Sequence, residues 1–205
     1  MTFVNKWITG LIALVSVAAF GAPETWKIDD AHSVAQFTIK HMMVTNVSGQ
    51  ISGIKGAFVI DSADPTSLVI DANLDPKTIN TNNAKRDAHL KDPDFFDVKK
   101  NPTMTFKSKL VKKTDTGFDI TGDLTMHGTK KEVTLKAEPI TQPVKDAWGG
   151  VRRGFSATTQ INRKDFGLTW NKNLDAGGLA LGDDVKVNIE ISLVPDKPTK
   201  TGSKS

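Results

Sequence analysis

The residues most able to perform chemistry are histidines and aspartates, which would form a metal site or an acid–base pair. The four histidines are His32, His41, His89 and His127. A zinc site usually needs convergent ligands that include a short-spaced pair, and these positions offer none. Asp92, Asp94 and Asp97 resemble part of a calcium loop, but Pro93 interrupts them and the glycine and glutamate of an EF-hand are missing. We therefore expect no metal ion and no other cofactor.

Catalytic motifs are also missing from the sequence. There is no Gly-x-Ser-x-Gly, P-loop or His-Glu-x-x-His pattern, and no cysteine for thiol chemistry. If the protein were an enzyme, the candidate residues would be Asp87, His89, Arg163 and Asp165. Polar residues in loops more commonly bond neighbouring backbone groups, so we expect these four to pin loops. The sequence thus favours a protein that is not an enzyme.

The net charge of +4 raises the question of nucleic-acid binding. Cations and carboxylates are interleaved along the chain, however, and no basic block forms. In the segment 104–110, alternation places Lys107 and Lys109 on one face of a strand and Phe106 and Leu110 on the other. An RNA-binding platform would gather aromatic rings and cations on the same face. We expect a solvated outer surface and no nucleic-acid partner.

The elements that would position a site are strands, because period-two alternation dominates the sequence after residue 22. One phase of this alternation is apolar and is expected to face inward at Phe37, Ile39, Phe58, Phe106, Leu124, Leu135, Phe155 and Ile189. The opposite phase is expected to face outward at Lys40, Lys107, Lys109 and Lys136. If the interior is open, the inward set would line a ligand site.

Turn residues divide the alternating runs. Glycines in the run 47–60 predict bends, and residues 114–117 and 127–129 predict hairpin turns. One helical region is expected over 82–91, and an irregular stretch over 163–184. About eight strands with one apolar phase each form either a sandwich or a closed barrel. Closure removes exposed edges, and eight strands leave an interior that is either filled by side chains or holds one ligand.

Several short motifs, in order, carry a family resemblance. They are Trp26–Asp29, Phe37–His41, Asp87–Leu90, Asp94–Asp97, Pro102–Ser108, Gly122–Gly128 and Arg163–Gly167. From Trp26 to about Val194 the sequence resembles the YceI family. The resemblance implies an all-β fold, an eight-stranded antiparallel lipocalin-like barrel with a short helix and an apolar interior tunnel. It also implies a periplasmic protein that binds a polyisoprenoid or another long amphiphile, with no catalytic residues to transfer.

The first 21 residues are expected to be a signal peptide. Lys6 precedes an apolar run over 7–20 and the small residues Gly21 and Ala22. A membrane anchor is the alternative, but a spanning helix needs about 20 apolar residues. We expect a barrel domain over 22–197, a disordered polar tail over 198–205 and a periplasmic location.

The leading hypothesis for function is a carrier or sequestering protein for a polyisoprenoid-type or other long-chain lipid. Alternatives are another apolar cargo such as a quinone or an antibiotic, an enzyme that acts on such a ligand, and a filled barrel that works through its surface. We expect no stable membrane insertion. The oligomeric state stays open, with a homodimer as one expectation.

The leader prediction is tested at the N-terminus of the exported protein. Cleavage after Gly21 should give a protein that begins at Ala22, with cleavage after Ala19 or Ala22 as neighbouring options. N-terminal sequencing of the periplasmic fraction measures this directly. A protein that keeps Met1 and stays in the membrane fraction would contradict the prediction.

Overall fold

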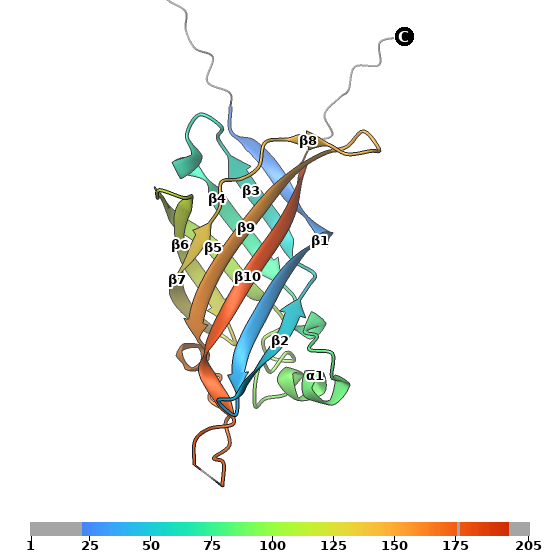
Figure 1. Ribbon diagram of the computed structural model, residues 1–205. Helices are drawn as coiled ribbons and strands as arrows, with labels where there is room; N and C mark the ends of the chain where they lie inside the picture. Colours follow the sequence, from blue (N-terminus) through green and yellow to red (C-terminus); the bar gives the residue numbers. More distant parts are fainter. Residues whose placement is uncertain (1–21, 176, 197–205) are drawn as a thin grey trace, which may run out of the picture.

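Eight antiparallel strands close on themselves to form the wall of a barrel (Figure 1). The computed structural model describes residues 22–175 and 177–196, so the segments expected as signal peptide and tail lie outside it. The strands are β1 (Glu24–His41), β3 (Lys55–Ile60), β4 (Val69–Leu74), β5 (Met104–Lys113), β6 (Phe118–Met126), β7 (Thr129–Ala137), β9 (Val151–Asn162) and β10 (Leu181–Pro195). Each pairs with the next in this order, and β10 returns to pair with β1, which confirms the expected barrel.

Two further strands modify this wall. β2 (Thr45–Ile51) pairs with the second half of β1, while β3 pairs with its first four residues. The run expected over 47–60 is therefore two strands, separated at Gly53, whose φ of +67° is a conformation that glycine adopts easily. β8 (Val144–Lys145) is a two-residue strand on the outer edge of β9.

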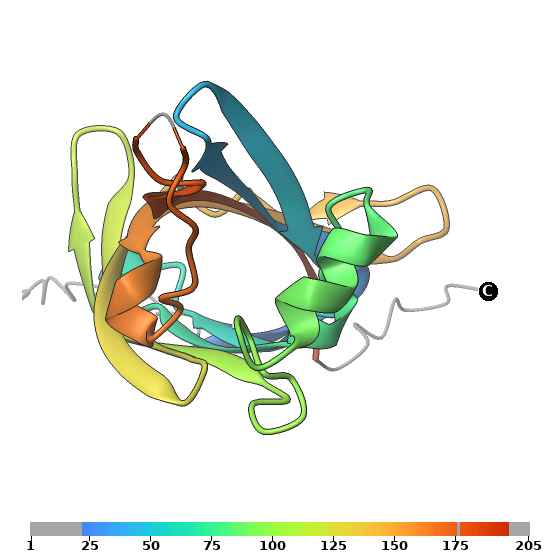
Figure 2. The same ribbon diagram turned by 90° about the horizontal axis from the view of Figure 1, so that it is seen from below.

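Connections at one end of the barrel surround its opening. The helix expected over 82–91 is α1 (Ala84–Lys91), and the side chain of Asn83 caps it by accepting from the N–H of Arg86 at 3.0 Å. The 3₁₀ turns η2 (Pro76–Thr78) and η3 (Arg163–Phe166) lie at this end, whereas η1 (Pro65–Ser67) joins β3 to β4 at the opposite end (Figure 1). Seen from below, α1 and η3 lie on opposite sides of the barrel end (Figure 2). Among the described residues, no helix has the length and apolar character needed to cross a membrane.

Side-chain alternation follows the expected phase on most strands. The inward set packs in the interior, and the four lysines expected outside are all exposed. Leu110 is the exception, because a register shift between Ser108 and Leu110 inserts Lys109 as an extra residue. This bulge reverses the phase beyond it, so Leu110 is 49% exposed and Val111 is buried instead. The prediction that Leu110 shares the face of Phe106 is wrong for this reason.

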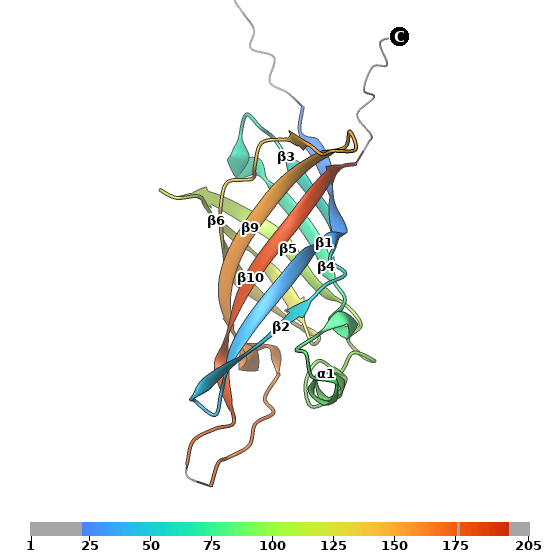
Figure 3. The ribbon, with the colours of Figure 1, turned by 45° about the vertical axis from the view of Figure 1, so that its right-hand side comes forward.

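The interior is packed at one end and accessible at the other. Along β10, the inward side chains Val185, Val187 and Ile189 are partly exposed, whereas Ile191 and Leu193 are buried. All five share one phase of a single strand, so the difference reflects their depth in the barrel. The packed residues lie toward the end where the described chain begins and ends, and the cavity lies toward the end that holds α1, whose position Figure 3 shows.

Aromatic side chains close the solid end. Phe58 and Phe155 meet edge to face, with ring centroids 5.0 Å apart, and both are almost fully buried. Beyond them the guanidinium of Arg153 lies over the ring of Trp26, 5.3 Å from its centroid, and donates to the carbonyl oxygen of Thr141 at 2.9 Å. Burial lowers the pKa of Arg153 from its ordinary value. These packed side chains therefore close this end of the barrel.

Two apolar residues of β10 test the division between the packed and hollow halves. Leu193→Ala should lower the free energy of unfolding by about 2–5 kcal/mol, because Leu193 is fully buried and its truncation opens a cavity among close-packed neighbours. Ile189→Ala removes as many atoms beside space that is already open, and should cost about 1 kcal/mol. Urea unfolding followed by circular dichroism measures both. Equal losses at the two positions would mean that the interior is packed along its whole length.

Candidate ligand-binding tunnel

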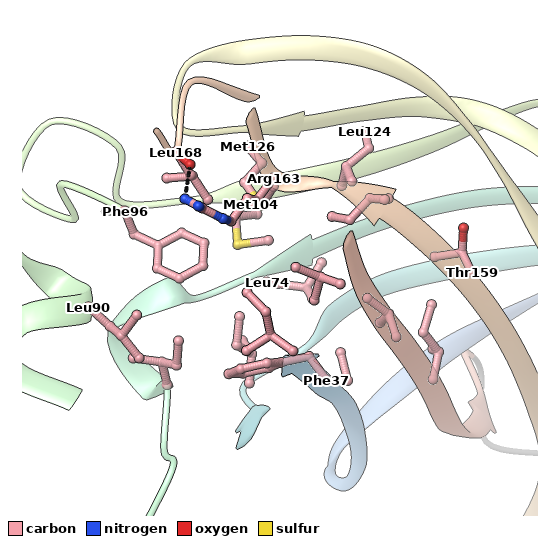
Figure 4. Close-up of a pocket in the computed structure, with 18 of the residues that line it drawn as sticks. Phe37, Leu74, Leu90, Phe96, Met104, Leu124, Met126, Thr159, Arg163 and Leu168 are labelled. Carbon is pink, nitrogen blue, oxygen red and sulfur yellow. Dashed lines mark hydrogen bonds between the residues drawn. The ribbon is translucent and has the colours of Figure 1, made fainter. Parts of the chain in front are cut away.

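The hollow half of the barrel contains a cavity of about 360 Å³. This volume lies within the range of small-molecule sites. Its wall combines inward side chains of the strands with side chains from α1, from the segment after it and from the segment after η3. The eight residues expected to line a site, Phe37, Ile39, Phe58, Phe106, Leu124, Leu135, Phe155 and Ile189, all lie in this wall. Figure 4 shows Phe37, Leu74 and Leu124 around the open space.

Two phenylalanines of the wall lie across glycines on neighbouring strands. Phe37 of β1 is paired with Gly49 of β2, and a Cβ on Gly49 would lie 2.6 Å from the tip of the Phe37 ring. Gly122 of β6 is paired with Ser108 of β5 and lies diagonally across from Phe106, and a Cβ on Gly122 would also lie 2.6 Å from the tip of the Phe106 ring. Any larger residue would push the ring into the cavity or out of place. The glycines thus set how wide the tunnel is at these levels.

Arg163 organises one side of the tunnel mouth. Its side chain is buried and donates to the carbonyl oxygen of Leu168 at 2.5 Å (Figure 4). It also donates to the carbonyl oxygens of Trp170 and Gly182, each at 2.8 Å. Burial lowers the pKa of Arg163 from its ordinary value, and the carboxylate of Asp183 at 3.2 Å partly offsets this. The five N–H groups of a guanidinium suit it to hold three carbonyls at once. Arg163 therefore fixes the chain after η3 against the start of β10.

Arg86 and Asp87 fix the opposite side. The Nε and Nη2 of Arg86 donate to the hydroxyl and carbonyl oxygens of Thr81, each at 2.7 Å. The carboxylate of Asp87 accepts from the backbone N–H of Thr81 at 2.9 Å and from its hydroxyl at 2.5 Å. Thr81 itself is buried in the wall. These bonds tie the first turn of α1 to the segment that joins η2 to α1.

An aromatic cluster joins the two sides of the mouth. The ring of His89 on α1 meets Phe95 and Trp170 edge to face, with centroids 5.0 and 5.1 Å away, and its Nε2 lies 2.9 Å from the carboxylate of Asp94. Trp170 belongs to the segment that Arg163 holds. The rim therefore has a fixed shape, built from α1, the residues that follow it and the chain after η3.

The residues that would perform catalysis do not converge on the cavity. His89 and Arg163 lie in the wall, whereas Asp87 is engaged with Thr81 and Asp165 is exposed on the outer surface. In residues 22–175 and 177–196, every buried side-chain N or O atom has a hydrogen-bond partner. Within those ranges no cluster of three metal-ligating side chains occurs. What this arrangement can do is enclose an apolar chain and leave a polar end at the rim.

Several wall residues escaped the alternation pattern. They are Thr81, Arg86, Leu90, Phe95, Phe96, Leu168 and Trp170. All come from α1 and its flanking segments or from the chain after η3, where no period of two exists. The aromatic pair Phe95-Phe96 in a polar stretch was the one visible signal, because large apolar residues in a loop need a buried place.

Comparison with known sequences finds a matching domain model and several similar proteins. The model of the YceI-like domain matches residues 26–193. A UPF0312 protein of Pseudomonas aeruginosa is 39% identical over 145 residues, covering 70% of this chain and 75% of the relative. A UPF0312 protein of Yersinia pestis is 35% identical over 170 residues, covering 81% of this chain and 88% of the relative.

Solved structures share the barrel. The YCEI protein of Campylobacter jejuni is 32% identical, with a TM-score of 0.64 over 77% of this chain and 90% of that one. BcnA of Burkholderia cenocepacia is 19% identical, with a TM-score of 0.69 over 80% of this chain and 98% of that one. At this identity the match supports a shared fold and nothing further. With the family model matched across nearly the whole barrel, this chain belongs to the YceI family.

Proposed function

We propose that this protein binds a polyisoprenoid-type or other long-chain amphiphilic lipid in the tunnel and carries or sequesters it in the periplasm. The observation that supports this proposal most is the partial exposure of apolar side chains that face the interior. Phe37, Ile39 and Leu124 face the interior and yet stay partly exposed, because the cavity lies beside them. Apolar surface left uncovered inside a barrel is suited to an apolar guest.

Burial of the guest is enough to drive binding. Each methylene transferred from water gains about 0.8 kcal/mol, so a chain of about twenty carbons has a gross gain near 16 kcal/mol. Loss of translational freedom and ordering of the chain reduce this substantially. Useful affinity remains without a dedicated polar contact, which agrees with a wall whose polar groups already bond one another.

Holding the ligand fits the site better than converting it. A general acid or base needs a group within hydrogen-bond reach of the substrate. At the mouth, Arg163 already holds three carbonyls, Asp87 holds Thr81, and His89 is paired with Asp94. These roles stabilise the rim, so we infer that the protein acts as a binding protein.

Two further observations support the class of ligand and the location. A polyisoprenoid binding domain from Saccharophagus degradans shares the fold, with 15% identity and a TM-score of 0.60 over 83% of this chain and 98% of that one. The leader-like order of Lys6, the apolar run over 7–20 and Gly21 supports export to the periplasm. The ligand proposal itself depends on the tunnel of this chain.

Ligand binding is tested with geranylgeraniol as the probe. Organic extraction and native mass spectrometry of the purified protein should reveal a bound apolar molecule, and protein stripped of it should take up geranylgeraniol. Leu124→Trp fills the tunnel and should weaken uptake about tenfold or more, a loss of about 1.4 kcal/mol in binding free energy.

Leu110→Trp is the matched control, because the same residue type faces solvent there and uptake should not change. Circular dichroism confirms that both variants are folded. Protein that is folded, yields no extractable ligand and takes up neither geranylgeraniol nor a fatty acid would contradict the proposal. Equal uptake by the two tryptophan variants would place the ligand outside the tunnel.

A further inference from the structure

The turn between β1 and β2 presents three consecutive apolar side chains to solvent. Met42 is 45% exposed, Met43 is 62% exposed and Val44 is 80% exposed. We call Met42, Met43 and Val44 the apolar tip. Isolated apolar residues on a surface need no explanation, but three in a row at the end of a projecting hairpin form a patch suited to an apolar surface.

The backbone of the turn does not explain these residue types. Met42 and Met43 have φ angles of +50° and +61°, in the left-handed region that hairpin turns usually fill with Asn and Gly. A methionine there costs conformational energy that an Asn–Gly pair would avoid. The sequence therefore places large apolar side chains where local structure disfavours them, which points to a use for the side chains themselves.

The apolar tip adjoins the open end of the tunnel, but none of its three residues lines the cavity. The N–H of Met42 donates to the carbonyl oxygen of Ala180 at 2.8 Å. Ala180, Leu181 and His41 all line the cavity, so the tip directly adjoins its wall. This end of the molecule lies opposite the end where the described chain begins and ends (Figures 1 and 3). The exposed apolar tip thus lies directly beside the wall of the apolar interior.

Charges near the tip are mixed. Lys40 and Lys172 are exposed, and so are Asp175 and Asp184. The ammonium of Lys164 is paired with Asp183 at 2.8 Å. Because the exposed lysines and aspartates are equal in number, this end of the barrel is attracted little to an anionic or a cationic surface. Binding to a surface would then depend on insertion of the apolar side chains. Methionine suits this role because its unbranched side chain adapts to an irregular environment.

We propose that the apolar tip docks the open end of the barrel onto a phospholipid bilayer, so that the lipid enters the tunnel without crossing water. A long-chain lipid resides in a bilayer, and a rim inserted among the headgroups gives it an apolar path to the cavity. This proposal rests on the proposed lipid-binding function. The apolar tip would be the surface that contacts the bilayer, through its three side chains.

The test separates docking from binding with the double variant Met42→Asn/Met43→Gly. Transfer of geranylgeraniol from phosphatidylcholine vesicles to this variant should be about tenfold slower than to the unchanged protein. Uptake of geranylgeraniol from detergent solution should be unchanged, because the tunnel is untouched. Thermal stability should stay equal or rise, since Asn and Gly suit the turn.

Trp148→Ser is the matched control. Trp148 is 90% exposed in the turn that joins β8 and β9, at the opposite end of the barrel (Figure 1). Its loss should leave vesicle transfer unchanged. Normal transfer by the Met42→Asn/Met43→Gly protein, or slow transfer by the Trp148→Ser protein, would overturn the proposal.

Vesicle flotation supplies a readout that needs no tunnel ligand. The unchanged protein should float with phosphatidylcholine vesicles to a measurable extent, and the double variant should not. Equal flotation of the two overturns docking by the tip. If the tip-dependent flotation is present while geranylgeraniol is never taken up from detergent, the lipid-binding function fails and the membrane contact stands.

Discussion

Closure of the sheet by the pairing of β10 with both β9 and β1 is the constraint on which the rest of the structure depends. β10 forms ten residue pairs with β9, from Asp184 with Asn162 to Leu193 with Arg153, and it also pairs with β1 along its length. Closure satisfies the backbone groups of the wall without help from the interior. An open sheet of this size would have to bury its apolar face against a second layer. A closed barrel can leave part of that face uncovered, and this protein does so on one side of the Phe58–Phe155 pair.

Closure also explains why the mouth is built from irregular segments. β1 exchanges its partner from β3 to β2 along its length, and β2 meets the following chain through the single backbone bridge of Gln50 with Asn80. The wall is therefore discontinuous near the opening. The segment with α1 and the chain after η3 cover this region, and their backbone groups need partners that no strand supplies. Arg163 and Asp87 supply them, which is why charged residues stand beside an apolar tunnel.

Sequence periodicity predicted the strand faces well, because most strands of the wall have one largely apolar and one largely polar side. It failed at Leu110, where a bulge adds one residue and inverts the phase; nothing in an alternating stretch reveals such an insertion. The family resemblance implied the closed barrel and the tunnel, which alternation alone left open. The wall residues Arg86 and Trp170 were not predicted, because their positions depend on how α1 and the chain after η3 fold over the opening. Glycine spacing predicted the bend at Gly53, but it gave no sign that Gly49 and Gly122 make room for phenylalanine rings.

The packed half of the interior stabilises the fold, and the hollow half is the part suited to binding. Buried residues near the Trp26 end, among them Phe58 and Leu193, pack densely and contribute most of the interior stabilisation. Side chains nearer the mouth, such as Ile39 and Val185, border open space and contribute less. Substitutions in the hollow half can therefore change the shape of the tunnel at little cost in folding free energy. Backbone pairing holds the wall together without help from the side chains that border the cavity. The packed end can therefore stay fixed while the hollow half adapts to ligands of different length.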